Sequence, residues 1–295
     1  MANSIDLVTK FTAILDELYK VQSKTARLDA PTENDPSFEG TNAVKVMKTS
    51  VVGMGTYSRS TGYPKGDVTI TWETLTLAAS RGRELSIDRM DNEETLGQAF
   101  GTLAAEYYRT AVVPEVDAYR FAKFAGWSGV STTTGATLSA TDVLDAIDAA
   151  MAQMDADEVP EEGRLLYVSN AIAGYIKGAV TRMLGNENAV DRRVRSLDGV
   201  EIIPVPQSRF QTAIDLDAGA TTSAGGFAPS AGAKDINFML IYPPAVLTAT
   251  KLDKLKIFDP DVNQSKDAWL VQHRLYHDAF VYDNKVDGIY VHKKA

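Results

Sequence analysis

Cysteine is absent from the 295 residues of this chain, which excludes disulfide bonds, thiolate nucleophiles and cysteine-ligated metals. Histidine is scarce: only three occur, and all lie after residue 272. Positive charge is in the minority, since 30 Lys and Arg against 39 Asp and Glu give a formal charge of -9. A protein that binds nucleic acid without regard to sequence needs concentrated Lys and Arg to neutralise phosphates. The composition therefore argues against most common catalytic classes and against a general nucleic-acid binder.

Long apolar runs are missing too. The longest uncharged and fairly apolar run covers residues 236–250 and is interrupted by Pro243 and Pro244, whereas a helix that spans a bilayer needs about 20 residues. The first residues, Met1–Asp6, have neither the basic patch nor the apolar stretch of a signal peptide. We expect no membrane association and a soluble chain made in the cytoplasm.

The usual signatures of catalytic and metal sites are also missing. His273 and His277 are four residues apart, but the pattern around them predicts a strand, in which such positions lie about 13 Å apart and cannot share one metal. The segment 259–263 resembles part of a calcium loop without its glycine and terminal glutamate, so we expect a polar turn. Glycines at 53–55 and 225–226 match neither dinucleotide nor phosphate loops, and no GxSxG motif occurs. We predict no enzyme, no cofactor and no metal.

The N-terminal residues have the pattern of a short amphipathic helix followed by an irregular arm. Apolar residues at spacings of three and four predict a helix over residues 5–19. Residues 20–42 contain Pro31, Pro36 and Gly40 and show little periodicity. Because such an arm buries little surface by itself, we expect it to dock on another surface.

Residues 44–88 have the pattern of β structure. Val44 and Val46 begin a first strand, residues 67–77 alternate strongly and are rich in β-branched side chains, and residues 53–66 are rich in turn formers. The second strand could extend about 35 Å. A hairpin that long is marginal alone and needs another surface, in its own domain or elsewhere, to cover its apolar face.

A long helix follows the hairpin. Asp91 and Glu94 resemble a capping box. The apolar residues after them lie on one helical face and predict a helix that continues to Ala125, with a kink or break at Pro114. These residues are Leu96, Phe100, Leu103, Tyr107 and Ala111.

Two further regions complete the chain. Residues 128–141 form a linker rich in Ser, Thr, Gly and Ala, and helices and strands then alternate to residue 250, which predicts a compact mixed α/β unit. The last 45 residues return to β structure. The strands that we predict there are 252–258, 268–276, 279–282 and 288–292.

The order of these parts resembles the major capsid protein of tailed double-stranded DNA phages, the Hong Kong 97 type fold. One stretch carries most of the resemblance: it runs from Tyr57-Ser58-Arg59-Ser60-Thr61-Gly62-Tyr63 through Trp72-Glu73 to Asp88-Arg89-Met90-Asp91, and on into residues 113–120. The second stretch comprises residues 273–281 and 288–291. Both are similar to a subgroup common among phages and prophages of Gram-positive bacteria.

This resemblance implies an α+β fold with four parts. Residues 1–43 would form the N-terminal arm, and residues 44–91 an extended β-hairpin loop that lies over a neighbouring subunit. Residues 92–140 and 251–295 would form the peripheral domain with its long spine helix, and residues 141–250 the α/β axial domain.

The function implied is structural. Copies of the chain would assemble into pentamers and hexamers of an icosahedral head, a virion component assembled in the host bacterial cytoplasm. The head would enclose double-stranded DNA without sequence-specific binding. A separate scaffolding protein and a portal would be further partners. An encapsulin-like shell that encloses a cargo protein is one alternative. The other is an α/β enzyme with its site in residues 141–250. A polar pocket containing Tyr167, Arg192 and Arg193 with a perturbed carboxylate would support this alternative, but the sequence shows no such set.

The hairpin supplies the candidate interface residues. Tyr57, Arg59, Tyr63 and Lys65 lie at its expected tip, and aromatic and Arg side chains make good interface anchors. Trp72 would pack on the spine helix or on a neighbouring subunit, with a core role inside its own chain as the alternative. Some family members cross-link Lys to Asn. Lys65 could be paired with Asn263 or Asn284, but no Glu can be placed beside them, so we expect no cross-link.

Overall fold

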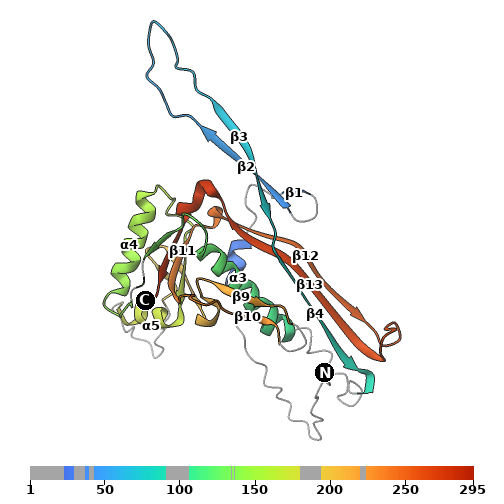
Figure 1. Cartoon of the computed structure of the whole chain (residues 1–295). Coiled ribbons are helices and arrows are strands. Elements are labelled where there is room, and N and C mark those ends of the chain that lie inside the picture. Colours follow the sequence, from blue (N-terminus) through green and yellow to red (C-terminus); the bar gives the residue numbers. More distant parts are fainter. Residues whose placement is uncertain are drawn as a thin grey trace, which may run out of the picture.

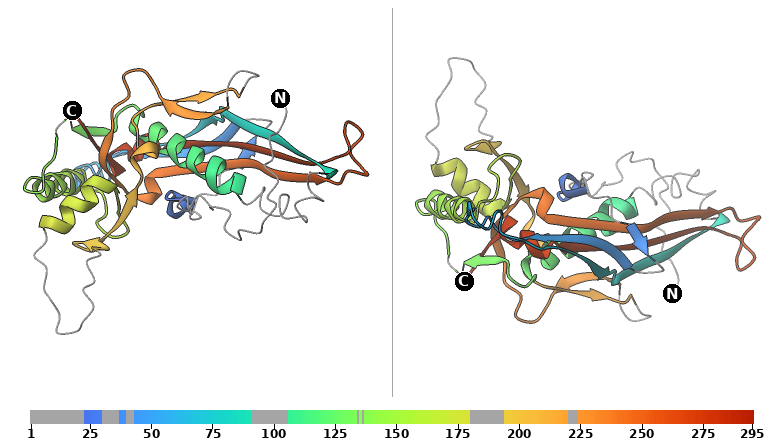
Figure 2. Two further views of the ribbon diagram at one scale, coloured as in Figure 1. Left: turned by 90° about the horizontal axis from the view of Figure 1, so that it is seen from below. Right: turned by 90° about the horizontal axis from the view of Figure 1, so that it is seen from above.

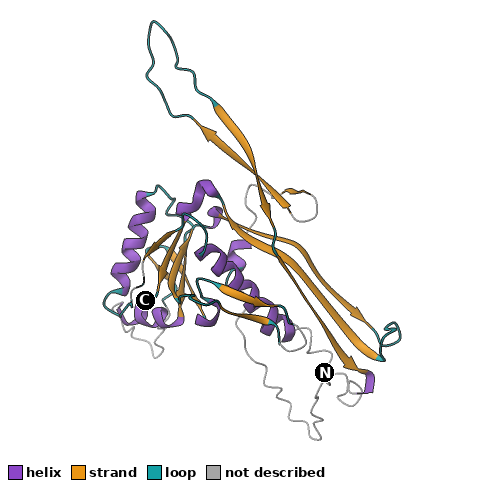
Figure 3. Cartoon of the chain, viewed as in Figure 1, coloured by secondary structure: helices purple, strands orange, loops and turns teal. Residues whose placement is uncertain are grey.

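The computed structural model describes residues 23–29, 37–39, 43–90, 106–133, 135, 137–179, 194–219 and 224–295. The helix predicted over residues 5–19 and the capping box at Asp91 and Glu94 lie outside these residues. Figure 1 shows a body with helices and strands, a narrow sheet that extends from it to one side, and a hairpin that projects from it in another direction. Figure 3 shows helices in the body and mostly strands in the two projecting parts.

The body is built on a six-stranded sheet with the strand order β5-β14-β11-β6-β8-β7. Strands β6 and β11 pair antiparallel at its centre and are buried along their whole length. Near-continuous apolar runs such as Ile236–Ile241 are typical of strands covered on both faces. The strands are β5 (Ser131–Thr133), β6 (Leu165–Ser169), β7 (Ser196–Leu197), β8 (Val200–Val205), β11 (Ile236–Ile241) and β14 (Ile289–Lys293).

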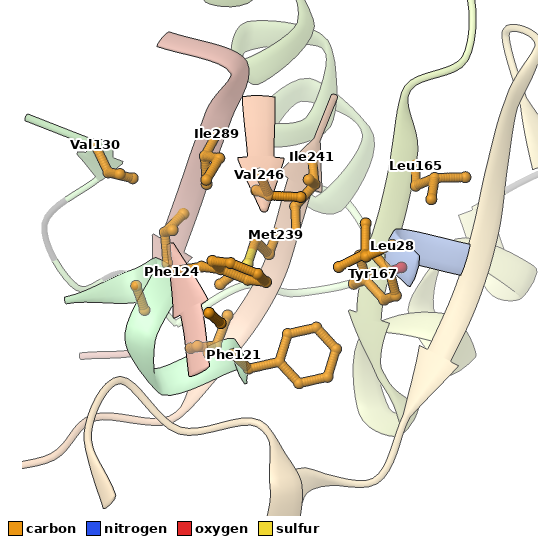
Figure 4. Packing of buried hydrophobic residues seen from close by; sticks show 14 of the residues in the cluster. Leu28, Phe121, Phe124, Val130, Leu165, Tyr167, Met239, Ile241, Val246 and Ile289 are labelled. Carbon is orange, nitrogen blue, oxygen red and sulfur yellow. The ribbon is translucent and has the colours of Figure 1, made fainter. Parts of the chain in front are cut away.

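Helices cover both faces of this sheet. On one face, α4 (Val143–Ala156) and α5 (Asn170–Ala179) pack with Leu166 and Leu240. On the other face, Phe121 and Phe124 of α3 (Val113–Ala125) pack with residues of β6, β11 and β14, as Figure 4 shows. Alternate residues of each central strand therefore enter two different clusters, and the body contains two hydrophobic layers separated by one sheet.

Strand β14 lies within residues 251–295, which the sequence-based division assigns to the peripheral domain. It pairs antiparallel with β11 and parallel with β5, so it belongs to the six-stranded sheet. The physical reason is the burial of β11. Its backbone needs ladder partners on both edges, and β6 supplies only one of them.

A second sheet has the order β12-β13-β4 and is antiparallel throughout. Its strands are β12 (Val246–Phe258), β13 (Ala268–Val281) and β4 (Ala79–Asp88). Strand β13 is continuous where the sequence predicts two strands, since the polar His277 and Asp278 in the gap are buried inside it. Strand β4 was grouped with the hairpin, but it pairs with β13 from Ala79 to Asp88. The backbone N–H of Ala78 donates to Asp278 at 2.8 Å. This bond fixes the point where the chain leaves the hairpin and enters β4.

The helix continues through Pro114, where the sequence predicts a kink or break. A π-helical turn, η2 (Tyr108–Val112), runs directly into α3. Pro114 directly follows this π-helical turn, so regular α-helical hydrogen bonding is interrupted at the proline although the backbone remains helical. No described helix is long and apolar enough to cross a membrane.

Short elements complete the fold. They are η1 (Ala26–Asp29), β1 (Ser37–Glu39), η3 (Gln207–Arg209), β9 (Ile214–Asp217), β10 (Gly226–Pro229), η4 (Pro243–Ala245) and η5 (Asp283–Gly288). Strands β9 and β10 form an antiparallel ribbon beside α3, which Figure 2 shows in two views.

Asp117 of α3 holds the segment that contains η1. Its fully buried carboxylate accepts hydrogen bonds from the backbone N–H of Lys24 (2.9 Å) and Thr25 (3.2 Å). It also accepts from the hydroxyls of Ser23 (2.8 Å) and Thr25 (2.7 Å). Arg209 of η3 donates to the same carboxylate at 3.0 Å. One side chain therefore joins three segments that are distant in sequence.

His277 gives the fold a pH dependence. Its ring is 2% exposed and lies edge-on to Tyr119, with 5.2 Å between the ring centroids. Burial, assisted by the positive charge of Arg120, lowers the pKa of His277 to about 4. Below pH 6.5, the ordinary pKa of histidine, His277 is protonated in the unfolded chain but stays neutral in the folded chain. The free energy of unfolding therefore decreases as the pH falls from about 6.5 toward 4.

We expect His277→Asn to reduce the acid sensitivity of the folded chain. A pKa lowered from about 6.5 to about 4 corresponds to a loss of about 2 kcal/mol in the free energy of unfolding between pH 7 and pH 5, and Asn has no proton to gain. Urea unfolding of both proteins at these two pH values measures the difference. Equal losses in the two proteins would contradict the assignment of this pH dependence to His277.

Candidate subunit interface

The hairpin consists of β2 (Ala43–Val51) and β3 (Val68–Thr76), which pair in register from Ala43 with Thr76 to Val51 with Val68. Its base is packed on the body. Val44, Val46, Leu75 and Leu77 share a cluster with residues of β12 and β13. Lys48 also forms an ion pair with Asp283, with 3.4 Å between Nζ and a carboxylate oxygen. The base is therefore anchored, and the rest of the hairpin projects beyond it (Figure 1).

One face of the projecting part is apolar and uncovered. Met47 lies opposite Trp72, and Val51 lies opposite Val68. Because alternate residues of a strand share a face, Ile70 lies on this face between the two pairs. The exposed fractions of these side chains are 52% for Met47, 70% for Val51, 63% for Val68, 57% for Ile70 and 60% for Trp72. We call these five residues the apolar hairpin face.

The opposite face is polar. Lys48 pairs with Thr71, and Ser50 pairs with Thr69. An exposed, contiguous apolar patch with polar surroundings is typical of an interaction site, whereas single exposed apolar residues are normal. This two-sided character makes the hairpin the candidate interface.

The tip brings some of the predicted residues together. The rings of Tyr57 and Tyr63 lie 5.0 Å apart between centroids. Between them, the N–H of Gly62 donates to the carbonyl of Ser58 at 2.8 Å, and Gly62 has a φ of 79°, which favours glycine. Arg59 lies within this turn and is exposed, as is Lys65 beyond it.

Trp72 lies on β3 and belongs to the apolar hairpin face, not to the tip. Its 60% exposure means that the core role inside its own chain does not apply in this structure. Met47, Val51, Val68 and Ile70 were not singled out from the sequence. The available signal was the alternation of residues 67–77, which places Val68, Ile70 and Trp72 on one strand face.

The residues considered for other functions have different surroundings. Tyr167 is fully buried in the core shared with Phe121, and burial raises its pKa. Arg192 and Arg193 lie outside the described residues. His273 and His277 lie on β13, as predicted, and the described part of the chain contains no group of three potential metal ligands. At 259–263 the predicted turn is present, since the N–H groups of Val262 and Asn263 both donate to the carbonyl of Asp259.

Comparison with known proteins gives matches among solved structures alone. No family model matches the chain, and no curated protein matches it. Among the similar structures is that of Mycobacterium phage Che8, with 13% identity, coverage of 99% of this chain and 96% of that chain, and a TM-score of 0.64. The capsid structure of the cyanophage P-SCSP1u has 14% identity, coverage of 98% and 93%, and a TM-score of 0.66. The capsid of an empty GTA particle has 13% identity, coverage of 87% and 92%, and a TM-score of 0.54.

These matches cover most of this chain and most of each matched chain, and they confirm the predicted fold. The chain has the Hong Kong 97 type fold that the sequence resemblance implied, with mixed helices and strands. At this level of identity the likeness establishes the fold, and function has to be argued from the surface of the molecule.

Proposed function

We propose that this chain is a structural subunit that assembles with its own copies into the icosahedral head of a phage, which encloses double-stranded DNA. The apolar hairpin face carries this proposal. Five apolar side chains on a projecting hairpin have no covering surface within the described part of their own chain, and a second copy can provide one. The likeness to the capsid structures of a cyanophage and a GTA particle supports the proposal.

The hairpin contacts are heterologous. The apolar hairpin face of one copy would rest on a different surface of the next, and such contacts close into rings when the rotation allows. We propose pentamers and hexamers as these rings. Tyr57, Arg59, Tyr63 and Lys65 at the tip would add contacts at the far end of the hairpin, beyond Trp72. Each contact can be weak, because a closed shell is held by many contacts at once.

The remaining parts of the proposal follow from the shell. A separate scaffolding protein and a portal would take part in its assembly, in the cytoplasm of a bacterial host. The chain has a formal charge of -9. This charge suits a container that encloses DNA without binding it tightly or reading its sequence. The contacts of a shell subunit require no catalytic group.

Electron microscopy and sedimentation of the full chain test the proposal. We expect closed particles, either from the chain alone or after co-expression with a scaffolding protein. Nucleic acid in particles from an infected or induced host would distinguish a DNA container from a shell for a cargo protein. A monodisperse monomer or dimer under every one of these conditions would show that the proposal is wrong.

Shortening the hairpin tip should separate assembly from folding. We expect replacement of residues 56–66 by an Asn-Gly turn to leave the free energy of unfolding within about 0.5 kcal/mol of the original, because the exposed tip adds nothing to the core clusters. Particle yield, measured by sedimentation, should fall at least about tenfold through loss of the interface anchors. Normal yield from the shortened chain would show that the tip is dispensable.

A further inference from the structure

A groove on the sheet formed by β12, β13 and β4 gathers positive charge. Lys254 of β12 lies opposite Arg274 of β13, which lies opposite Gly82 of β4. Lys256 occupies the next row on the same face, two residues along β12. These residues line a hollow with a volume of about 590 Å³. We call Lys254, Lys256 and Arg274 the cationic groove.

The groove lies on the face of the sheet that points away from α3. His273 precedes Arg274 on β13, is 5% exposed and packs against the ring of Tyr108, with 4.8 Å between centroids. Arg81 precedes Gly82 on β4 and donates to Glu115 of α3. Because neighbouring residues of a strand point to opposite faces, the cationic groove opens to solvent, and all three of its cations are exposed.

The described residues compensate this positive charge only in part. Glu84 lies on the same face and accepts a hydrogen bond from Gln272 at 2.8 Å, so three cations and one carboxylate share this face. Asp253, next to Lys254, is held on the other face by His273 and by the hydroxyl of Tyr108. Within the described residues, Lys254, Lys256 and Arg274 have no hydrogen-bonding or ion-pair partner. Like charges directly opposite one another on neighbouring strands destabilise a sheet, so this arrangement favours an anionic occupant.

Gly82 keeps the groove open beside Arg274. A Cβ atom at this position would lie 2.9 Å from the carbonyl oxygen of His273. A side chain at position 82 therefore does not fit without movement of the backbone. No side chain fills the groove at Gly82, beside Arg274 and Lys254.

We propose that the cationic groove binds an extended, carboxylate-rich segment of a partner protein. Lys254 and Lys256 are two residues apart on one strand, which separates them by about 7 Å, the same spacing as alternate side chains of an extended peptide. Arg274 offers a planar, two-pronged donor to a further carboxylate. The spacing of Lys254 and Lys256 along one strand matches an extended segment, and a nucleic-acid duplex is compared with it in the test below.

Binding of an acidic peptide to the full chain tests this inference independently of shell formation. The probe is a fluorescein-labelled peptide of alternating Glu and Thr, and the readout is fluorescence anisotropy. We expect saturable binding that weakens as salt rises from about 50 to 200 mM. The triple variant Lys254→Gln, Lys256→Gln, Arg274→Gln should bind at least about tenfold more weakly, because three exposed ion pairs are lost.

A matched variant controls for net charge. Arg195→Gln, Lys234→Gln, Lys266→Gln removes the same two Lys and one Arg from exposed positions outside the groove, and it should bind the peptide as the original chain does. Equal weakening in both variants would overturn the inference, as would a duplex oligonucleotide that binds more tightly than the peptide in a groove-dependent manner. Self-association that the peptide displaces would assign the groove to a second copy and would also overturn it.

Discussion

The double variant Ile70→Thr, Trp72→Thr is expected to remain folded and to lose particle formation. Both side chains are more than half exposed, at 57% and 60%, so their replacement costs the isolated subunit little. Thr is β-branched, a shape that suits a strand. At an interface the same change removes two large apolar anchors, and truncation of a central anchor typically costs about 2 kcal/mol or more per contact. The cost recurs at every subunit of a shell, so we expect particle yield to fall to background.

Sedimentation and electron microscopy measure the particle yield, and urea unfolding measures the free energy of unfolding of the subunit. The matched control is Ser50→Ala, Thr71→Ala on the polar face of the same hairpin, which should assemble normally. Trp72→Phe should retain assembly, since the apolar hairpin face keeps an aromatic anchor. The interface assignment is wrong if the Thr double variant forms particles in normal yield, or if both faces prove equally sensitive.

Local pattern predicted much of this fold. The alternation of residues 67–77 indicates a strand, and β3 spans Val68–Thr76. The strand predicted over residues 252–258 lies within β12, which spans Val246–Phe258 and ends at the same residue. The spacing of apolar residues shows which face of a helix or strand is buried. The presence and the type of these elements could therefore be predicted from the sequence.

Pairings over long sequence distances were less accessible. Nothing in residues 289–293 indicates that they complete a sheet begun at Ser131, because a strand with two buried faces looks alike in any sheet. The partner of β4 could not be predicted from local pattern either, because β13 lies almost 200 residues away. The alternation also marked the apolar hairpin face, but only the structure shows that nothing in the described part of the chain covers it.

Charged residues were the least predictable. Asp117 lies in the helical stretch Val113–Ala125, where an acidic residue is usually solvated. Its burial follows from the approach of residues 23–25 and of η3, two segments whose positions no local pattern determines. The cationic groove was missed for the same reason. Lys254 and Arg274 are 20 positions apart, and only the register of β12 with β13 makes them neighbours.

Replacing Asp117 with Ala is expected to be among the most destabilising single changes in the chain. The substitution leaves Arg209, whose side chain is 4% exposed, buried without its carboxylate, and it frees the N–H groups of Lys24 and Thr25. Loss of one partner from a buried ion pair typically costs about 3–5 kcal/mol. This is a large fraction of the roughly 5–15 kcal/mol that stabilises a typical folded protein.

Urea unfolding of Asp117→Ala and of the control Asp148→Ala, an exposed position on α4, measures this loss. The control should differ from the original chain by less than about 0.5 kcal/mol. Trypsin should also cleave Asp117→Ala faster at Lys24 and Arg27, because the segment that contains η1 loses its main anchor. If Asp117→Ala does not fold, Thr25→Val removes the hydroxyl that donates to the same carboxylate and accepts from Arg120, and it should cost about 1–3 kcal/mol. An Asp117→Ala chain as stable as the control would show that the carboxylate does not hold these three segments together.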